Sequence, residues 1–143
     1  MPRPSASRPQ AGDSLPPWIV EITTSMVIAG ALFNRDPQDV HHDRDITQGR
    51  GFQDIFMNTM TTTGLVTRYI NDWAGPEAVV KTFRFRLGRP NYPNDEMRVT
   101  GTVKTVEEAP EGLVATLEIN GDNSLGHHIS CEVCIAVPTP TQA

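Results

Sequence analysis

The chain has 143 residues, of which 38% are hydrophobic and 20% charged, and its formal net charge is −5. This length fits one domain with one core, and the composition predicts a packed globule rather than a disordered chain. An acidic balance without a run of Lys and Arg excludes the usual nucleic-acid binders, and no stretch approaches the roughly 20 apolar residues of a membrane span.

The two ends of the chain differ from its middle. Residues 1–17 are rich in Pro, Ser, Arg and Gly, which predicts a disordered or extended N-terminal arm and not the apolar core of a signal peptide. We expect one domain over residues 18–138, with ordered structure from Trp18, and a frayed tail over residues 139–143. Without a recognisable leader, the chain is expected to be cytoplasmic.

The first half of the domain contains one clear helical pattern. A short strand is expected over residues 24–32, and a polar loop follows. Residues 53–73 carry apolar side chains at helix-like spacings, which predicts a helix facing the core. Asp54 suits its N-cap or first turn, and Gly75 with the following Pro should end it. Because its threonines are poor helix formers, burial must hold this helix.

Four strand-like runs follow the helix and are separated by turns rich in Gly, Pro and Asn. They cover residues 78–87, 95–106, 112–121 and 125–137. One long helix followed by antiparallel strands predicts an α+β domain, in which a single antiparallel sheet wraps around one long central helix. That is the hot-dog arrangement. One sheet around one helix leaves a face and an edge open, so a dimer is expected.

The only two cysteines, Cys131 and Cys134, lie in the last predicted strand. A zinc site needs four ligands, and the chain has no second cysteine pair. Positions three apart in a strand point to opposite faces of the sheet. We therefore expect two small buried or half-buried residues in the last strand, and no metal site.

The densest polar stretch, residues 33–43, lies between the first predicted strand and the central helix. It contains Asp36 and His41, a carboxylate and an imidazole in a D-x-x-x-x-H spacing. Catalytic groups often occupy such loops because rigid elements hold both ends. On spacing alone, however, a surface loop is the default interpretation, because Asp and Asn near Pro are ordinary turn residues.

The segment DPQDVH, residues 36–41, resembles the MaoC-like hydratase motif D-x-N-P-[aliphatic]-H, which precedes the central helix of a hot-dog fold. Gln38 stands where Asn is usual, Asp39 where Pro is usual, and Arg35 where a Gly commonly precedes the Asp. Further runs resemble the small subunit of the actinobacterial two-subunit MaoC-like hydratases of steroid side-chain degradation. These runs are DVHHDRD at 39–45, DIF at 54–56, TGLV at 63–66 and DWAGP at 72–76.

The resemblance covers about residues 31–137. It implies an enoyl-CoA hydratase, R-specific, that adds water to a 2-enoyl-CoA thioester with Asp36 and His41 as its catalytic pair. Such hydration needs a base, an acid and N–H donors for the enolate oxygen, and the start of a helix offers unpaired N–H groups. By the resemblance, the Ile55 backbone amide is the donor and Thr63 faces the site. No cofactor or metal is implied, because CoA is part of the substrate.

Several alternatives stay open. A hot-dog thioesterase would need a carboxylate on the central helix, for which Asp54 is the nearby candidate. A non-catalytic partner subunit is a third possibility, although it would be expected to lose Asp36 or His41. The resemblance favours a heteromer with a motif-less MaoC-like chain over a homodimer, and it alone suggests a steroid acyl group. His42 is expected to lie behind the site or at the surface. Any of four arginines could meet the CoA phosphates, namely Arg68, Arg84, Arg86 and Arg89.

Overall fold

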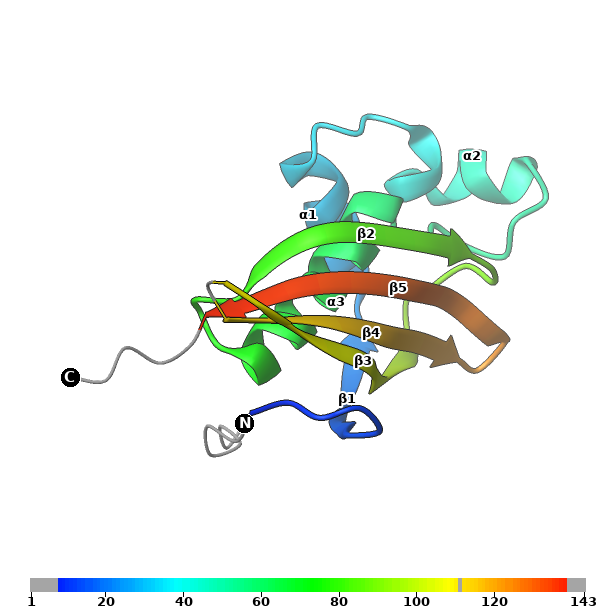
Figure 1. The fold of residues 1–143 in the computed structure, drawn as a ribbon. Coiled ribbons are helices and arrows are strands. Elements are labelled where there is room, and N and C mark those ends of the chain that lie inside the picture. Colours follow the sequence, from blue (N-terminus) through cyan, green and yellow to red (C-terminus); the bar gives the residue numbers. More distant parts are fainter. Residues whose placement is uncertain (1–7, 111, 139–143) are drawn as a thin grey trace.

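The computed structural model describes residues 8–110 and 112–138 (Figure 1). The helices precede most of the strands. In chain order the elements are β1 (Ser14–Ile22), α1 (Thr24–Phe33), the 3-10 turn η1 (Asp39–His41), α2 (Arg44–Gly49), α3 (Thr59–Ala74), β2 (Val79–Leu87), β3 (Asp95–Ala109), β4 (Gly112–Asn123) and β5 (Gly126–Pro138). The strands form one antiparallel sheet in the order β1-β3-β4-β5-β2, which curves around α3. The predicted hot-dog architecture is confirmed.

The core lies between α3 and the inner face of the sheet. α3 buries Val66 and Ile70 there, and β4 contributes Leu117 and Ile119 because alternate strand residues share one face. Burial of one such aliphatic side chain contributes about 1.5–3 kcal/mol. This exceeds the penalty of well under 1 kcal/mol for each threonine in the helix. The prediction that burial holds α3 therefore fits the observed packing.

The region before the catalytic loop differs from the prediction. Residues 24–32 form the helix α1 and not a strand. Thr23 caps this helix by accepting a hydrogen bond from the Met26 amide at 3.0 Å. The segment is apolar on nearly every side, so its periodicity does not separate a helix from a buried strand. The N-cap threonine was the signal that could have decided it.

The first strand lies earlier than expected and begins inside the stretch predicted to be an arm. β1 begins at Ser14, and Leu15 is buried in the core. Pro16 and Pro17 lie where the register of β1 against β3 shifts. Prolines are tolerated at such a bulge and on an edge strand because no ladder hydrogen bond is lost there. Residues 1–7 of the predicted arm, and the predicted tail at 139–143, lie outside the described residues.

The central helix also starts later than predicted. α3 begins at Thr59, and its N-cap is Asn58 and not Asp54. The residues before it are extended, and two of their amides are used elsewhere: Phe56 N–H donates to the Val40 carbonyl and Met57 N–H to the Asn91 carbonyl. These bonds hold the segment away from helical geometry. The predicted end was right, because α3 ends at Ala74 and Gly75 takes a φ of 94°.

β2 lies at one edge and leaves three large apolar side chains exposed, those of Val79, Phe85 and Leu87. In β5, Cys131 is buried and Cys134 is half-buried, as expected from the sequence, and both thiols are free. Burial raises the pKa of the Cys131 thiol to about 12. Among the helices of the described residues, none is long and apolar enough to cross a membrane.

Candidate active site

Asp36 lies directly after the C-terminus of α1, in a turn closed by backbone hydrogen bonds. Arg35 N–H donates to the Leu32 carbonyl at 3.1 Å, and Asp36 N–H donates to the Ala31 carbonyl at 2.9 Å. These two bonds form a Schellman motif, in which the residue after the cap is left-handed. Arg35 takes that conformation with a φ of 53°. The closed turn fixes the position from which the Asp36 side chain projects.

His41 enters the site from η1 and meets Asp36. Its Nε2 atom lies 3.2 Å from Asp36 Oδ2, and its side chain is 6% exposed against 24% for that of Asp36. On the other side of the ring, Nδ1 lies 2.7 Å from the carbonyl oxygen of Phe56. The phenyl ring of Phe56 packs edge-on against the imidazole, with the ring centroids 5.3 Å apart. The structure therefore brings together the two side chains predicted to be the catalytic pair.

The partners of His41 determine where its protons lie. A backbone carbonyl only accepts hydrogen bonds, so Nδ1 carries the proton that bonds Phe56. In the neutral ring, Nε2 is then an acceptor that faces the carboxylate of Asp36. Two acceptors this close can both receive hydrogen bonds from one water molecule. In the protonated ring, Nε2–H instead donates to the carboxylate. Either way, the pair can hold and exchange one proton.

Asp36 is arranged to stay ionised. Burial raises its pKa, but several opposing interactions together outweigh that effect and leave the pKa below its ordinary value. Asn58 donates to Asp36 Oδ2 at 3.2 Å, the Gln38 amide lies 3.4 Å from Oδ1, and His41 adds positive charge when protonated. Asp36 is therefore a carboxylate at neutral pH, which is the form that accepts a proton.

The start of α3 lies beside this pair, because the N-cap Asn58 bonds Asp36. Asn58 Oδ1 accepts from the Thr61 amide, while the amides of Thr59 and Met60 donate to no acceptor in the part of the chain that the structure describes. The first N–H groups of a helix are its positive end. Two such donors are thus available at the site.

Ile55 does not lie at the start of the helix, so the reason for choosing its amide as donor was wrong. Its N–H donates to the side chain of Asp54 at 2.7 Å, and Ile55 itself is buried in the core. Asp54 also accepts from Arg44 Nε at 2.7 Å. The register was misjudged because Asp54 looks like an N-cap in the sequence, whereas the later Asn58 is the residue that caps.

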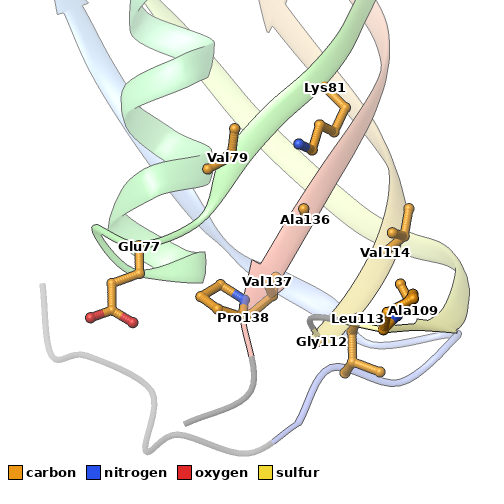
Figure 2. A pocket seen from close by; sticks show the side chains of 11 residues that line it. Glu77, Val79, Lys81, Ala109, Gly112, Leu113, Val114, Ala136, Val137 and Pro138 are labelled. Atoms are coloured by element: carbon orange, nitrogen blue, oxygen red, sulfur yellow. The ribbon is translucent and has the colours of Figure 1, made fainter. Parts of the chain in front are cut away.

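One hollow of the described surface lies outside this site. It is formed by the start of β2, the turn between β3 and β4, and the end of β5 (Figure 2). Val79, Val114 and Ala136 give it an apolar lining, with Lys81 and Glu77 among the residues around it. None of its lining residues belongs to α1, η1 or the start of α3. The candidate chemistry and the hollow occupy separate places.

Comparison with known proteins gives the chain a family. The MaoC like domain family matches residues 16–120. A protein of Mycobacterium tuberculosis named 3-oxo-4,17-pregnadiene-20-carboxyl-CoA hydratase beta subunit is 45% identical over 109 residues, which cover 76% of this chain and 81% of that protein. The chain belongs to the MaoC-like family. The family predicted from the sequence is confirmed.

Solved structures agree with this MaoC-like assignment. A chain in the crystal structure of the ChsH1-ChsH2 complex from Mycobacterium tuberculosis is 39% identical and superposes with a TM-score of 0.84, covering 89% of this chain and 97% of that one. The (R)-hydratase from A. caviae involved in PHA biosynthesis is 17% identical with a TM-score of 0.83, over 93% of this chain and 100% of that one. At that identity it shows the fold alone.

Two further residues named in the sequence analysis, Thr63 and His42, lie near the site in this MaoC-like chain. Thr63 lies in the second turn of α3, half-buried, and its hydroxyl donates to the Met60 carbonyl at 3.1 Å. His42 is exposed, with Nε2 3.1 Å from the Pro37 carbonyl oxygen. Its predicted place at the surface is therefore observed. The role of Thr63 in facing the substrate remains a prediction.

Two polar groups near the site were missed from the sequence. Asn58 joins the helix start to Asp36, and its place after an extended DIFM run gave no sign of this. His128 of β5 is the second: its Nδ1–H donates to the Arg89 carbonyl at 2.5 Å, and its Nε2 lies 3.0 Å from the Thr62 hydroxyl of α3. Burial lowers the pKa of His128, so the neutral ring ties α3 to the sheet.

Proposed function

We propose that this chain is an enoyl-CoA hydratase that adds water across a 2-enoyl-CoA thioester to give a 3-hydroxyacyl-CoA. The contact between His41 Nε2 and Asp36 Oδ2 at 3.2 Å, beside the N-terminus of α3, is the observation that carries this proposal. The 45% identical relative has a name of the same reaction class, a CoA hydratase beta subunit. The family predicts R stereochemistry for the product.

The pair supplies both proton transfers of the reaction. Asp36 Oδ2 and His41 Nε2 both accept hydrogen bonds from one water that lies beside them, so that its oxygen lone pairs point outward to the β-carbon. As that oxygen bonds to the β-carbon, the pair takes one water proton and the alkene electrons move to the α-carbon and thioester oxygen. The pair then returns a proton to the α-carbon. General acid–base catalysis of this kind contributes about 10²- to 10⁴-fold.

The oxyanion donors are assigned to the start of α3, in place of Ile55. As the water adds, negative charge grows on the thioester oxygen, and preorganised N–H groups stabilise it strongly in a site without bulk water. The amides of Thr59 and Met60 are unused at this point of the chain, and Asn58 keeps them close to Asp36. The reaction is redox-neutral and both of its proton transfers have residues assigned, so the proposal includes no cofactor and no metal.

The acyl group and the partner are proposed from the surroundings of the site and from the relatives. Three exposed apolar side chains adjoin the site in the sequence. Leu32 and Phe33 end α1 just before Asp36, and Met60 lies in the first turn of α3; Phe33 is 92% exposed. An apolar acyl chain and a second hot-dog chain would cover such a surface. Since the relatives include a pregnadiene-carboxyl-CoA hydratase beta subunit and a chain of the ChsH1-ChsH2 complex, we propose a steroid enoyl-CoA and a heteromer with a motif-less MaoC-like chain.

A cytoplasmic location is also part of the proposal. The free thiols of Cys131 and Cys134 are compatible with it, because reducing compartments keep thiols reduced.

The position of Asp54 does not support the thioesterase alternative, which needs a carboxylate on the central helix. Asp54 lies before α3 and not on it, and Arg44 and the Ile55 amide occupy its carboxylate. The alternative of a non-catalytic partner subunit would predict that the pair is broken, whereas Asp36 and His41 are both present and in contact. The arrangement thus favours hydration by this chain.

The test measures reaction type and assembly together. The purified chain, alone and with a motif-less MaoC-like chain, is given crotonyl-CoA and a steroid enoyl-CoA, while loss of the enoyl thioester absorbance and release of free thiol are followed. We expect a 3-hydroxyacyl-CoA without free thiol, and faster turnover of the steroid substrate in the mixture. Thiol release from a saturated acyl-CoA without hydration would favour the thioesterase. A homodimer fully active on the steroid substrate and unaffected by a partner would refute the heteromer alone.

A further inference from the structure

Asn58 is the most highly connected polar side chain near the candidate pair, and it is 3% exposed. Its Oδ1 accepts from the Thr61 amide at 2.9 Å and from the Thr61 hydroxyl at 2.6 Å, and the Asn34 Nδ2 atom lies 3.4 Å away. Its Nδ2 donates to Asp36 Oδ2 at 3.2 Å. One carboxamide therefore connects the end of α1, the start of α3 and the Asp36 carboxylate.

The orientation of this carboxamide is fixed by the chemistry of its partners. The Thr61 amide is only a donor, so the atom of Asn58 that faces it must be oxygen. An ionised carboxylate is only an acceptor, so the atom that faces Asp36 must be the NH₂ group. Both requirements are met by one orientation, and the flipped amide would violate both. Asn58 thus presents a donor to Asp36 that cannot be exchanged for an acceptor.

We propose that Asn58 is a positioning residue for the reaction, whose side chain caps α3 and, through the same amide, holds the Asp36 carboxylate in place against His41. This inference rests on the proposed function for its kinetic consequences. Asn58 donates to the same oxygen, Oδ2, that meets His41 Nε2. It leaves Oδ1 to the Gln38 amide, so each oxygen of Asp36 has a fixed partner.

The packing around Asn58 supports a fixed geometry. Gly30 of α1 lies against Thr61, and a Cβ built on Gly30 would come within 2.2 Å of the Thr61 hydroxyl. The absence of a side chain lets α1 approach the first turn of α3, where Asn34 Nδ2 also reaches Thr61 Oγ1 at 3.3 Å. Asp36 follows α1 directly, so this contact sets the spacing between Asp36 and Asn58. A cap without a catalytic link would not require that spacing.

Two substitutions separate the cap from the donor. Asn58→Ser keeps an N-cap oxygen for the Thr61 amide but has no group long enough to donate to Asp36. Asn58→Asp also keeps the cap but turns a carboxylate oxygen toward Asp36, and a like charge raises a carboxyl pKa. As a control, Thr23→Ala removes the N-cap of α1 without touching Asp36. Its expected cost of about 0.5–2 kcal/mol in unfolding free energy is that of an ordinary lost cap.

The experiment compares these variants with the unchanged chain in its active assembly, as pH profiles of kcat and KM. We expect Asn58→Ser to lower kcat by roughly 10- to 100-fold, the effect of a misplaced catalytic group, with KM changed by less than about threefold. Asn58→Asp should move the acid limb of kcat/KM upward by roughly one pH unit or more. Thr23→Ala should lower the melting temperature and leave the acid limb in place.

A second readout does not depend on the reaction. The carboxyl carbon of Asp36 is titrated by NMR in chain labelled at aspartate, with Asp36→Asn to assign the signal. Both Asn58 variants should titrate at higher pH than the unchanged chain. An unmoved Asp36 titration together with unchanged kcat in both variants would overturn the proposal. A moved titration in a chain that lacks hydratase activity would refute the proposed function and support the role of Asn58. If Asn58→Ser does not fold, the titration of Asn58→Asp decides.

Discussion

The two ends of the molecule show what marks a site in this fold. At one end, α1, η1 and the start of α3 bring both His41 and Asn58 into contact with Asp36. At the other end, the hollow of Figure 2 offers an apolar lining, but Lys81 and Glu77 beside it form no ion pair within the described residues. The second end is concave, but none of Asp36, His41 and Asn58 lines it. Polar groups from separate elements that converge and satisfy one another identify the first.

The largest effect should come from removing either member of the pair. Asp36→Asn and His41→Ala should each lower kcat by a factor on the order of 10² to 10⁴, because each removes a positioned proton carrier. The double variant should be only slightly less active than the less active of the two single variants, since the effects of groups that act as a unit are not additive. Steady-state hydration kinetics measure this. Full activity in either single variant would remove the distinction between the two ends.

A smaller effect, on stability, should follow from filling the space between α1 and α3. Gly30→Ala places a methyl group against the Thr61 hydroxyl and should lower the unfolding free energy by about 1–3 kcal/mol, as overpacking does. Gly64→Ala is the matched control, because Gly64 lies within α3 and a Cβ there meets no atom within 4 Å. That variant should gain about 0.5–1 kcal/mol from helix propensity. Urea unfolding compares the two, and equal effects would contradict close packing at the site.

The left-handed residue before Asp36 gives a third, finer test. Arg35→Gly should raise the unfolding free energy by about 1 kcal/mol, because glycine adopts a φ of 53° without the steric penalty of a side chain. Arg35→Ala keeps a Cβ and should gain nothing. The pair of variants separates backbone strain from loss of the arginine side chain. Equal melting temperatures for both would show that the turn is not strained.

The smallest effect is expected at the far hollow. Lys81→Ala should change kcat and KM by less than about twofold, because Lys81 lies near the start of β2, whereas the first turn of α3 meets the sheet at His128, near the end of β2. The same hydration assay measures it. A loss comparable to that of Asp36→Asn would mean that the hollow takes part in the reaction and that the comparison of the two ends is wrong.

Much of the fold followed from local patterns. The four strands after α3 were found because they alternate cleanly and are separated by Gly and Pro turns. The end of α3 was found because Gly75 takes a conformation that few other residues accept. α1 was missed because an element that is apolar on all sides has no periodicity to read. β1 was missed because Pro16 and Pro17 look like linker residues, whereas here they occupy a bulge on an edge strand.

In the site, too, residues close together in the sequence were predicted and residues joined only by tertiary contacts were missed. Asp36 and His41 belong to one short segment, so a motif could place both. Asn58 reaches Asp36 only through the packing of α1 on α3, and His128 reaches Thr62 from the last strand. Contacts between residues so distant in sequence depend on tertiary structure, so they cannot be predicted from local patterns in one sequence. The start of α3 was misplaced for a related reason, since the backbone bonds to Val40 and Asn91 keep the preceding residues extended.

The open edge of β2 has a consequence for how the chain is made. Val79, Phe85 and Leu87 are exposed along a strand whose outer backbone groups face no neighbouring strand of the sheet. Such an edge is a template for any extended segment, including another copy of itself. In the proposed heteromer, every molecule produced in excess of its partner would keep that template uncovered. If the proposed partner pairs with this edge, balanced synthesis of the two chains would keep it covered.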